Sequence, residues 1–172
     1  MYKLKTHLYL LVIANFLACQ FSNKSEQVKT SYKVIHNSVL RIYKDGDIFF
    51  IEAGRLLHEA RSYRDSIIDT KEFEKILDQV RYNSESEFTA LNLSREPDIK
   101  INYKQKALKV WNMLNDIYRT ELEQFVSAFN SKSQAKIDAC YDLLKDKIAK
   151  IEQAMIECDN AGKALREKYN ID

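Results

Sequence analysis

The chain has 172 residues, of which only 3 are glycine and 1 is proline, and its formal net charge at pH 7 is +2. Strand-rich folds need tight turns, and tight turns depend on residues such as glycine, proline and asparagine. The scarcity of glycine and proline therefore argues against a β-sandwich, a β-barrel and a doubly wound α/β fold. Hydrophobic residues make up 45% of the chain and charged residues 30%, which argues against a disordered chain.

The N-terminus has the layout of a secretory signal. Lys3 and Lys5 precede an apolar run over residues 8–18, and this run ends at Cys19. A basic segment, a short apolar segment and a small residue at the cut are typical of a signal peptide. A helix of that length rises about 16 Å, roughly half of the apolar core of a bilayer, so the run is too short to span a membrane. We expect residues 1–18 to be a cleaved signal peptide, with a buried N-terminal helix as the alternative.

The residues before Cys19 resemble a bacterial lipobox, at which a signal peptidase cleaves just before a cysteine that is then lipidated. Ala18 and Cys19 match the usual pattern, whereas Phe16 and Leu17 depart from it. We expect Cys19 to carry acyl chains such as palmitate, because several chains on one cysteine anchor a protein stably whereas one chain binds weakly. An ordinary secretory signal that ends near a cysteine is the alternative.

Cleavage before Cys19 would change the charge balance. Lys3 and Lys5 are 2 of the 27 basic residues, and residues 1–18 hold no Asp or Glu, so 25 basic and 25 acidic residues would remain. With a formal net charge of zero, nothing in the overall balance predicts binding to nucleic acid.

Beyond the expected cut, residues 19–30 are short and polar and predict a lipidated cysteine followed by a flexible tether. Apolar residues then recur at helical spacing in five segments, the first of which begins within the tether at Val28. The segments run over residues 28–42, 49–67, 73–91, 103–129 and 137–169.

Four stretches interrupt this helical pattern. Lys44–Asp47 contains a glycine and ends in a possible N-cap residue, Asp47. Asn83–Ser86 predicts an interruption of the third segment. Pro97 marks the clearest break, because a proline pushes the preceding residue out of the α region. Asn130–Ser133 separates the last two segments. The pattern predicts an all-α fold, an antiparallel bundle of about five helices over residues 31–172, because short connections join antiparallel neighbours.

The sequence carries no recognisable catalytic motif. It has no Gly-x-Ser-x-Gly, no P-loop and no Glu-x-x-His pair of the kind that di-iron bundles use. His36 and His58 could form a zinc site with Cys140 and Cys158, but none of the four belongs to a short ligand pair, which favours surface or hydrogen-bonded histidines. We therefore expect no enzymatic activity, no metal and no cofactor.

Cys140 and Cys158 both lie in the last helical segment. On one unbroken helix, their separation of 18 residues corresponds to about 27 Å, whereas a disulfide needs Cα atoms within about 7 Å. The spacing predicts two free thiols, with Cys158 as a small core residue. An intermolecular bridge through Cys140 is the alternative.

Four lysines gather near the start of the fourth segment: Lys100, Lys104, Lys106 and Lys109. Such a cluster could bind a sulfated glycosaminoglycan or another acidic host surface by Coulomb attraction. The alternative is an ordinary solvated helix face, because Lys104 and Lys106 point to different sides of a helix.

The lipobox-like Phe16–Cys19, the short polar tether, the helical body and the Lys/Ile/Asn-rich composition together resemble the surface lipoproteins of Borrelia-type spirochaetes. This resemblance implies a lipid-anchored outer-membrane protein at the cell surface, a surface antigen that binds a host matrix component, glycosaminoglycan or serum protein. A periplasm-facing structural or assembly lipoprotein is the alternative. The exposed side of the last segment could also serve as a homodimer seam.

Overall fold

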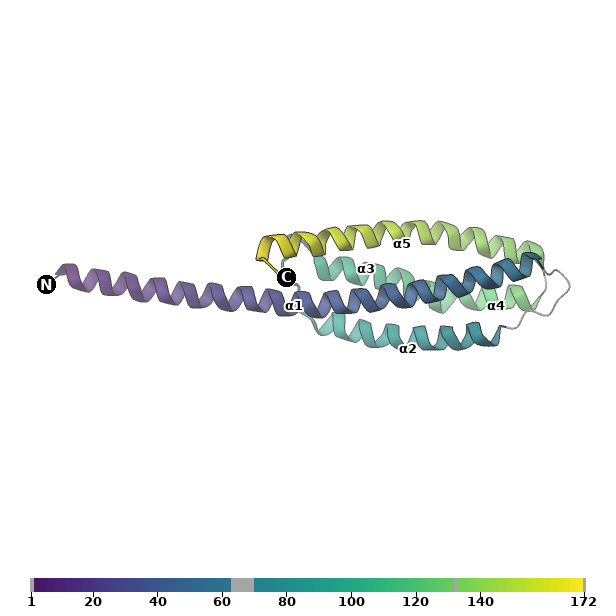
Figure 1. The fold of residues 1–172 in the computed structure, drawn as a ribbon, viewed down its shortest axis with the longest axis horizontal. Coiled ribbons are helices and arrows are strands. Elements are labelled where there is room, and N and C mark those ends of the chain that lie inside the picture. The colour runs from purple at the N-terminus through teal and green to yellow at the C-terminus, as the bar shows by residue number, and fades with distance from the viewer. Residues whose placement is uncertain (1, 63–69, 132, 172) are drawn as a thin grey trace.

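The computed structural model describes the backbone of residues 2–62, 70–131 and 133–171, and within these ranges the side chains from Lys24 onward except those of residues 60, 61 and 121–123. The described residues form helices and connecting loops without any strand (Figure 1). The elements are α1 (Tyr2–Ser62), α2 (Lys71–Leu93), α3 (Tyr103–Asp116), the π-helix η1 (Ile117–Glu121), α4 (Leu122–Asn130) and α5 (Gln134–Tyr169). The predicted all-α fold is confirmed.

These elements build a bundle of four antiparallel rods. Because α3, η1 and α4 follow one another without a break, they act as a single rod. This rod packs against α2 and α5, and both α2 and α5 also pack against α1 (Figure 1). The expected count of about five helices is therefore slightly too high, since the first two predicted segments are one helix.

Two predicted interruptions are wrong because both stretches keep the register of a buried face. Gly46 lies inside α1, where it is buried and a β-carbon at its position would contact Leu114 at 3.7 Å. Asp47 is an exposed residue within this helix and not an N-cap. In α2, Ser84 is only 6% exposed, and its carbonyl oxygen accepts a hydrogen bond of 2.7 Å from Trp111 Nε1. Packing against α3 thus carries both helices through these polar stretches.

The two remaining breaks are confirmed. The loop around Pro97 separates α2 from α3, and it ends at Asn102, whose positive φ of 57° is a left-handed conformation that asparagine tolerates. Asn130 is the last residue of α4, and α5 begins at Gln134. Both connections are short, which makes the joined rods antiparallel neighbours.

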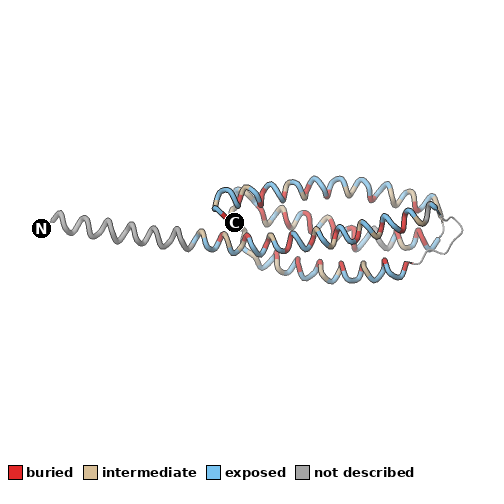
Figure 2. Tube along the Cα trace, viewed as in Figure 1, coloured by how far each residue is buried: buried red, intermediate tan, exposed pale blue. Residues whose placement is uncertain are grey.

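The core follows the inner side of every helix (Figure 2). Toward the end of the bundle where α2 begins, the core is aromatic: Phe49, Phe73 and Phe125 are all fully buried, with ring centroids 5.8 and 5.9 Å apart in succession. At the other end of α1 the core begins at Val28, which is 5% exposed. Residues 19–30, the predicted lipidated cysteine and tether, lie within helix α1.

The π-helix η1 widens one turn in the middle of the third rod. In a π turn, a backbone N–H group donates to the carbonyl oxygen five residues earlier in the chain and not to the one four residues earlier. The carbonyl oxygen of Tyr118 in this turn accepts a hydrogen bond of 2.7 Å from Arg81 Nε on α2. The irregular turn is therefore held by a side chain from a neighbouring helix.

Candidate functional site

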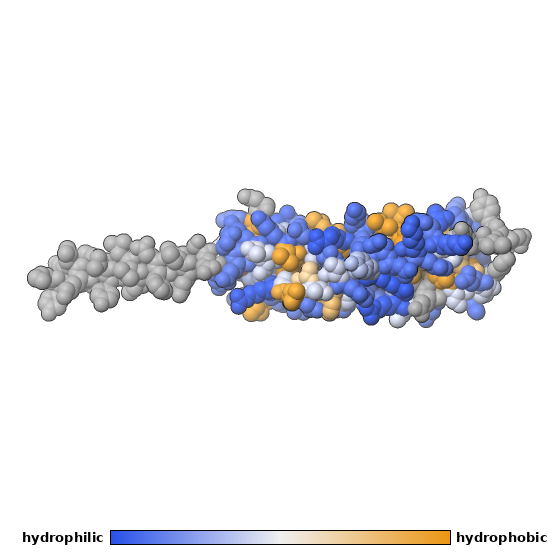
Figure 3. All heavy atoms as spheres, turned by 90° about the horizontal axis from the view of Figure 1, so that it is seen from below, coloured by the Kyte–Doolittle hydropathy of each residue, from blue (hydrophilic) through white to orange (hydrophobic). Residues whose placement is uncertain are grey.

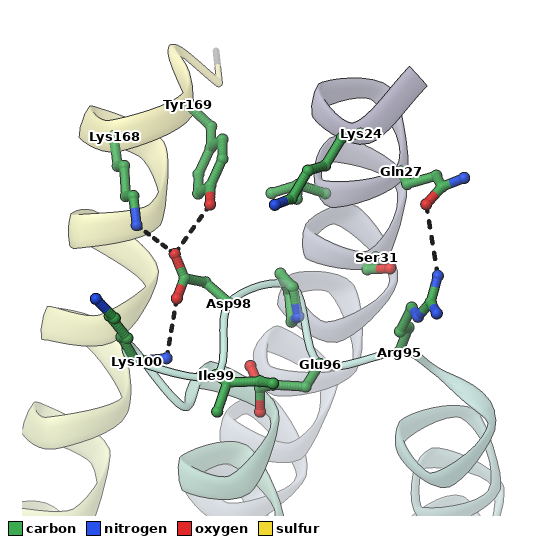
Figure 4. Close-up of a pocket in the computed structure, with 12 residues that line it drawn as sticks. Lys24, Gln27, Ser31, Arg95, Glu96, Asp98, Ile99, Lys100, Lys168 and Tyr169 are labelled. Carbon is green, nitrogen blue, oxygen red and sulfur yellow. Dashed lines mark hydrogen bonds and ion pairs between the residues drawn. The ribbon is translucent and has the colours of Figure 1, made fainter. Parts of the chain in front are cut away.

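A groove lies at the end of the bundle where α1 joins the other helices. It has a volume of about 780 Å³. The α2–α3 loop forms its floor, with α1 on one side and the C-terminal end of α5 on the other (Figure 4). Four basic and two acidic side chains line it: Lys24, Arg95, Lys100, Lys168, Glu96 and Asp98.

Asp98 ties the loop to the end of α5. Its Oδ2 atom accepts hydrogen bonds from Lys168 Nζ at 2.5 Å and from the Tyr169 hydroxyl at 2.9 Å, and its Oδ1 atom accepts one from the backbone N–H of Lys100 at 2.9 Å (Figure 4). The Lys168 contact is the main reason that the pKa of Asp98 falls to about 2. This carboxylate is thus ionised and fully engaged by the protein itself.

Glu96 and Lys104 are also occupied, because they complete the ends of two helices. The carboxylate of Glu96 accepts the free backbone N–H groups of Lys104 and Gln105 at the start of α3, both at 3.3 Å. The Lys104 ammonium group donates to the carbonyl oxygens of Asn92 and Ser94 at the end of α2, at 2.9 and 2.7 Å. Both residues therefore have a structural role in the loop.

Three cations at the groove remain without a carboxylate partner among the residues that the structure describes: Lys24, Arg95 and Lys100. All three are exposed. Arg95 makes one long hydrogen bond of 3.5 Å, from Nη1 to Gln27 Oε1 (Figure 4). With four basic and two acidic side chains, the lining of the groove carries net positive charge.

Two large apolar side chains are exposed in the α2–α3 loop and at the helix end that precedes it. Ile99 in the loop is 81% exposed, and Leu93 at the end of α2 is 84% exposed. The face in Figure 3 is mostly hydrophilic with separate hydrophobic spots. Leu93 and Ile99 have the largest exposed fractions among the exposed large hydrophobic residues of the described chain.

The four lysines of the predicted cluster divide between two faces. Lys100 lies at the groove, and Lys104 turns toward α2. Lys109 pairs with Glu157 on α5, with 3.0 Å between Nζ and Oε2. The pKa of Glu157 is lowered mainly by this hydrogen bond, with a smaller contribution from the charge of Lys106. Lys106 and Lys109 thus share the α3–α5 flank, away from Lys104.

The histidines lie in different environments. The Nδ1 atom of His36 lies 3.3 Å from the Tyr103 hydroxyl, and the ring stacks on Tyr32 with centroids 5.3 Å apart. Burial, followed by the charge of Arg166, lowers the pKa of His36. His58 is exposed on α1. Among the residues searched, which are the described ones, no three potential metal-ligating side chains come together.

Cys140 and Cys158 are both free thiols on the unbroken helix α5, as the spacing predicts, and Cys158 is a fully buried core residue. The side chain of Cys19 lies outside the described residues. Within the part of the chain searched, which covers the described residues, no helix is long and apolar enough to cross a membrane.

The groove itself could not be found from the sequence. Lys24, Arg95 and Lys168 belong to three different elements, and each lies far from the others along the chain. The sequence signals were the Pro97 break and Lys100 of the predicted lysine cluster. They indicate a loop with a cation, but not which other helices lie beside it.

No protein-family model, no curated protein and no solved structure matches this chain.

Proposed function

We propose that this protein is a non-enzymatic lipoprotein that is held at the outer membrane by acyl chains on Cys19 and presents its helical bundle to a host molecule. The observation that carries the proposal is the sequence from Lys3 to Cys19, a basic segment and a short apolar run that end in a lipobox-like site. The packed core begins at Val28, only a few residues later. A lipid on Cys19 would therefore hold the bundle close to the membrane.

The host-binding part of the proposal concerns an acidic polymer such as a sulfated glycosaminoglycan. Lys106 and Lys109 lie on the α3–α5 flank, within the first two turns of α3. Lys109 is 54% exposed despite its contact with Glu157, so its charge is accessible to a partner. Coulomb attraction to a polyanion needs accessible cations on one surface.

The first experiment is protease shaving of intact cells beside permeabilised cells. We expect the protein to disappear from intact cells, because a surface-exposed bundle is accessible to a protease added outside. Protection until the envelope is opened would overturn the surface location and favour the periplasm-facing structural role.

The lipid anchor needs a separate test. We expect Cys19→Ser to prevent acylation, so that the protein leaves the detergent phase on temperature-induced phase separation while the wild type stays in it. The mass of the N-terminal peptide identifies the modification directly. A wild-type protein that carries no acyl chain on Cys19 would overturn the proposal.

A further inference from the structure

We infer that the end of the bundle that carries Lys24, Arg95, Lys100, Leu93 and Ile99 rests on a membrane surface and binds the headgroups of anionic phospholipids. This basic end, as we call it, comprises these five residues. The inference rests on the proposed lipidation of Cys19 and adds an orientation and a lipid class to it.

Chain length places the basic end near the anchor. Lys24 follows Cys19 by five residues. Five residues span about 7.5 Å as a helix and at most about 18 Å when fully extended. Whatever the conformation of that segment, Lys24 stays within this distance of a lipidated Cys19. Arg95 and Lys100 line the same groove as Lys24, so they stay close to the membrane too.

The charges of the basic end suit an anionic surface. Lys24, Arg95 and Lys100 are exposed and, among the residues described, have no carboxylate partner. The nearest carboxylates of the groove, Glu96 and Asp98, are bound by helix N–H groups and by Lys168. Lysine and arginine side chains next to a negatively charged leaflet are attracted to it over about one Debye length.

The apolar side chains of the basic end fit the same partner. Leu93 and Ile99 are the most exposed large apolar residues of the described chain. Ile99 lines the same groove as the cations, and Leu93 lies two residues before Arg95. At a membrane surface, such side chains enter the boundary between headgroups and acyl chains, while the cations stay at the headgroups. Basic and apolar residues at one end of a protein are typical of a contact with the membrane interface.

The test uses the mature lipoprotein, added to preformed vesicles of phosphatidylcholine alone or of phosphatidylcholine mixed with phosphatidylglycerol. Lysines are acetylated with a water-soluble reagent, and each site is quantified by mass spectrometry. With phosphatidylglycerol present, we expect acetylation of Lys24 and Lys100 to fall by about threefold or more. Lys136, which is exposed near the start of α5 at the opposite end of the bundle, is the internal control and should not change. High salt should restore the labelling of Lys24 and Lys100.

Charge reversal supplies the matched comparison. Amide hydrogen exchange over residues 95–101 should slow on anionic vesicles for the wild type and for Lys136→Glu with Lys145→Glu. It should not slow for Lys24→Glu with Lys100→Glu. The two double variants change the net charge equally, so a difference between them reports the position of the charges.

Each contrary outcome has a distinct meaning. If Cys19 is acylated and the acetylation of Lys24 and Lys100 is the same in both vesicle types, the proposed orientation is wrong and the lipid anchor is unaffected. Protection of Lys24 and Lys100 by inorganic phosphate in detergent, without vesicles, identifies a soluble-anion site and also overturns the orientation. A Cys19 without acyl chains overturns the anchor and the orientation together.

Discussion

The phenol ring of Tyr103 on α3 packs directly against Gly162 on α5. A β-carbon at Gly162 would lie 3.2 Å from the Cε2 and Cζ atoms of this ring and 3.3 Å from its hydroxyl oxygen. The ring also stacks on Tyr32 of α1, with centroids 5.6 Å apart, and Tyr103 is only 2% exposed. The ring is therefore held between two helices and has little room to retreat.

This contact predicts that Gly162→Ala destabilises the protein. Overpacking lowers the free energy of unfolding by about 1–3 kcal/mol, whereas the better helix propensity of alanine raises it by about 1 kcal/mol. We therefore expect the free energy of unfolding to fall by about 1 kcal/mol. Urea unfolding followed by circular dichroism measures it. Gly54→Ala is the control, because nothing lies within 4 Å of a β-carbon there, and it should raise the free energy of unfolding by about 1 kcal/mol. Equal stabilisation by both substitutions would contradict the close contact at Gly162.

The Asp98–Lys168 ion pair predicts a pH-dependent stability. The pKa of Asp98 in the folded protein is about 2, below the ordinary value of 3.8, mainly because of Lys168. Because the folded state favours the ionised carboxylate, Asp98 stabilises the fold at pH values above its ordinary pKa. This stabilisation is lost as the pH falls through the folded-state pKa. We expect Asp98→Asn to lower the free energy of unfolding by about 1 kcal/mol at pH 7. The effect is this small because Lys168 is half-exposed and solvent screens its charge. The difference should shrink as the pH falls through about 2, and a difference that stays constant with pH would exclude the ion pair as its cause.

The two thiols of α5 should differ in reactivity. Cys158 is 0% exposed, and burial raises its pKa to about 12, whereas Cys140 is partly exposed with a pKa that burial raises less. Because the thiolate is the reactive form, maleimide at pH 8 should modify Cys140 slowly and Cys158 only after denaturation. Peptide mapping separates the two sites. Rapid modification of Cys158 in the native protein would mean that the end of α5 opens.

The α3–α5 flank predicts where an acidic polymer binds. Lys106→Glu with Lys109→Glu should reduce retention on a heparin column, because both charges lie on that flank. Lys145→Glu with Lys150→Glu makes the same change of net charge with two exposed lysines of α5 and serves as the control. Equal retention of the two double variants would exclude a specific role for Lys106 and Lys109.

The sequence predicted most helices correctly but misplaced two of their boundaries. Gly46 and Ser84 are weak helix formers with polar neighbours, so local propensity favours a break at each. Both nevertheless lie at buried positions on the core-facing side of their helices. Packing of Gly46 near Leu114 and the hydrogen bond from Trp111 to Ser84 override the local preference. The π-helix had a sequence signal, because the apolar stripe passes from Ile117 to Leu122 in five residues where four is usual.

By itself, the sequence determined that this chain is an all-α bundle with free cysteines. The period of its apolar residues, its scarcity of glycine and the spacing of Cys140 and Cys158 are local properties that do not depend on which helices meet. Only the tertiary structure decided where each lysine points, because Lys104, Lys109 and Lys168 each contact a partner on another element of the fold. The groove at the basic end likewise depends on the tertiary structure. Its lining comes from α1, the α2–α3 loop and the end of α5, which meet only in the folded chain.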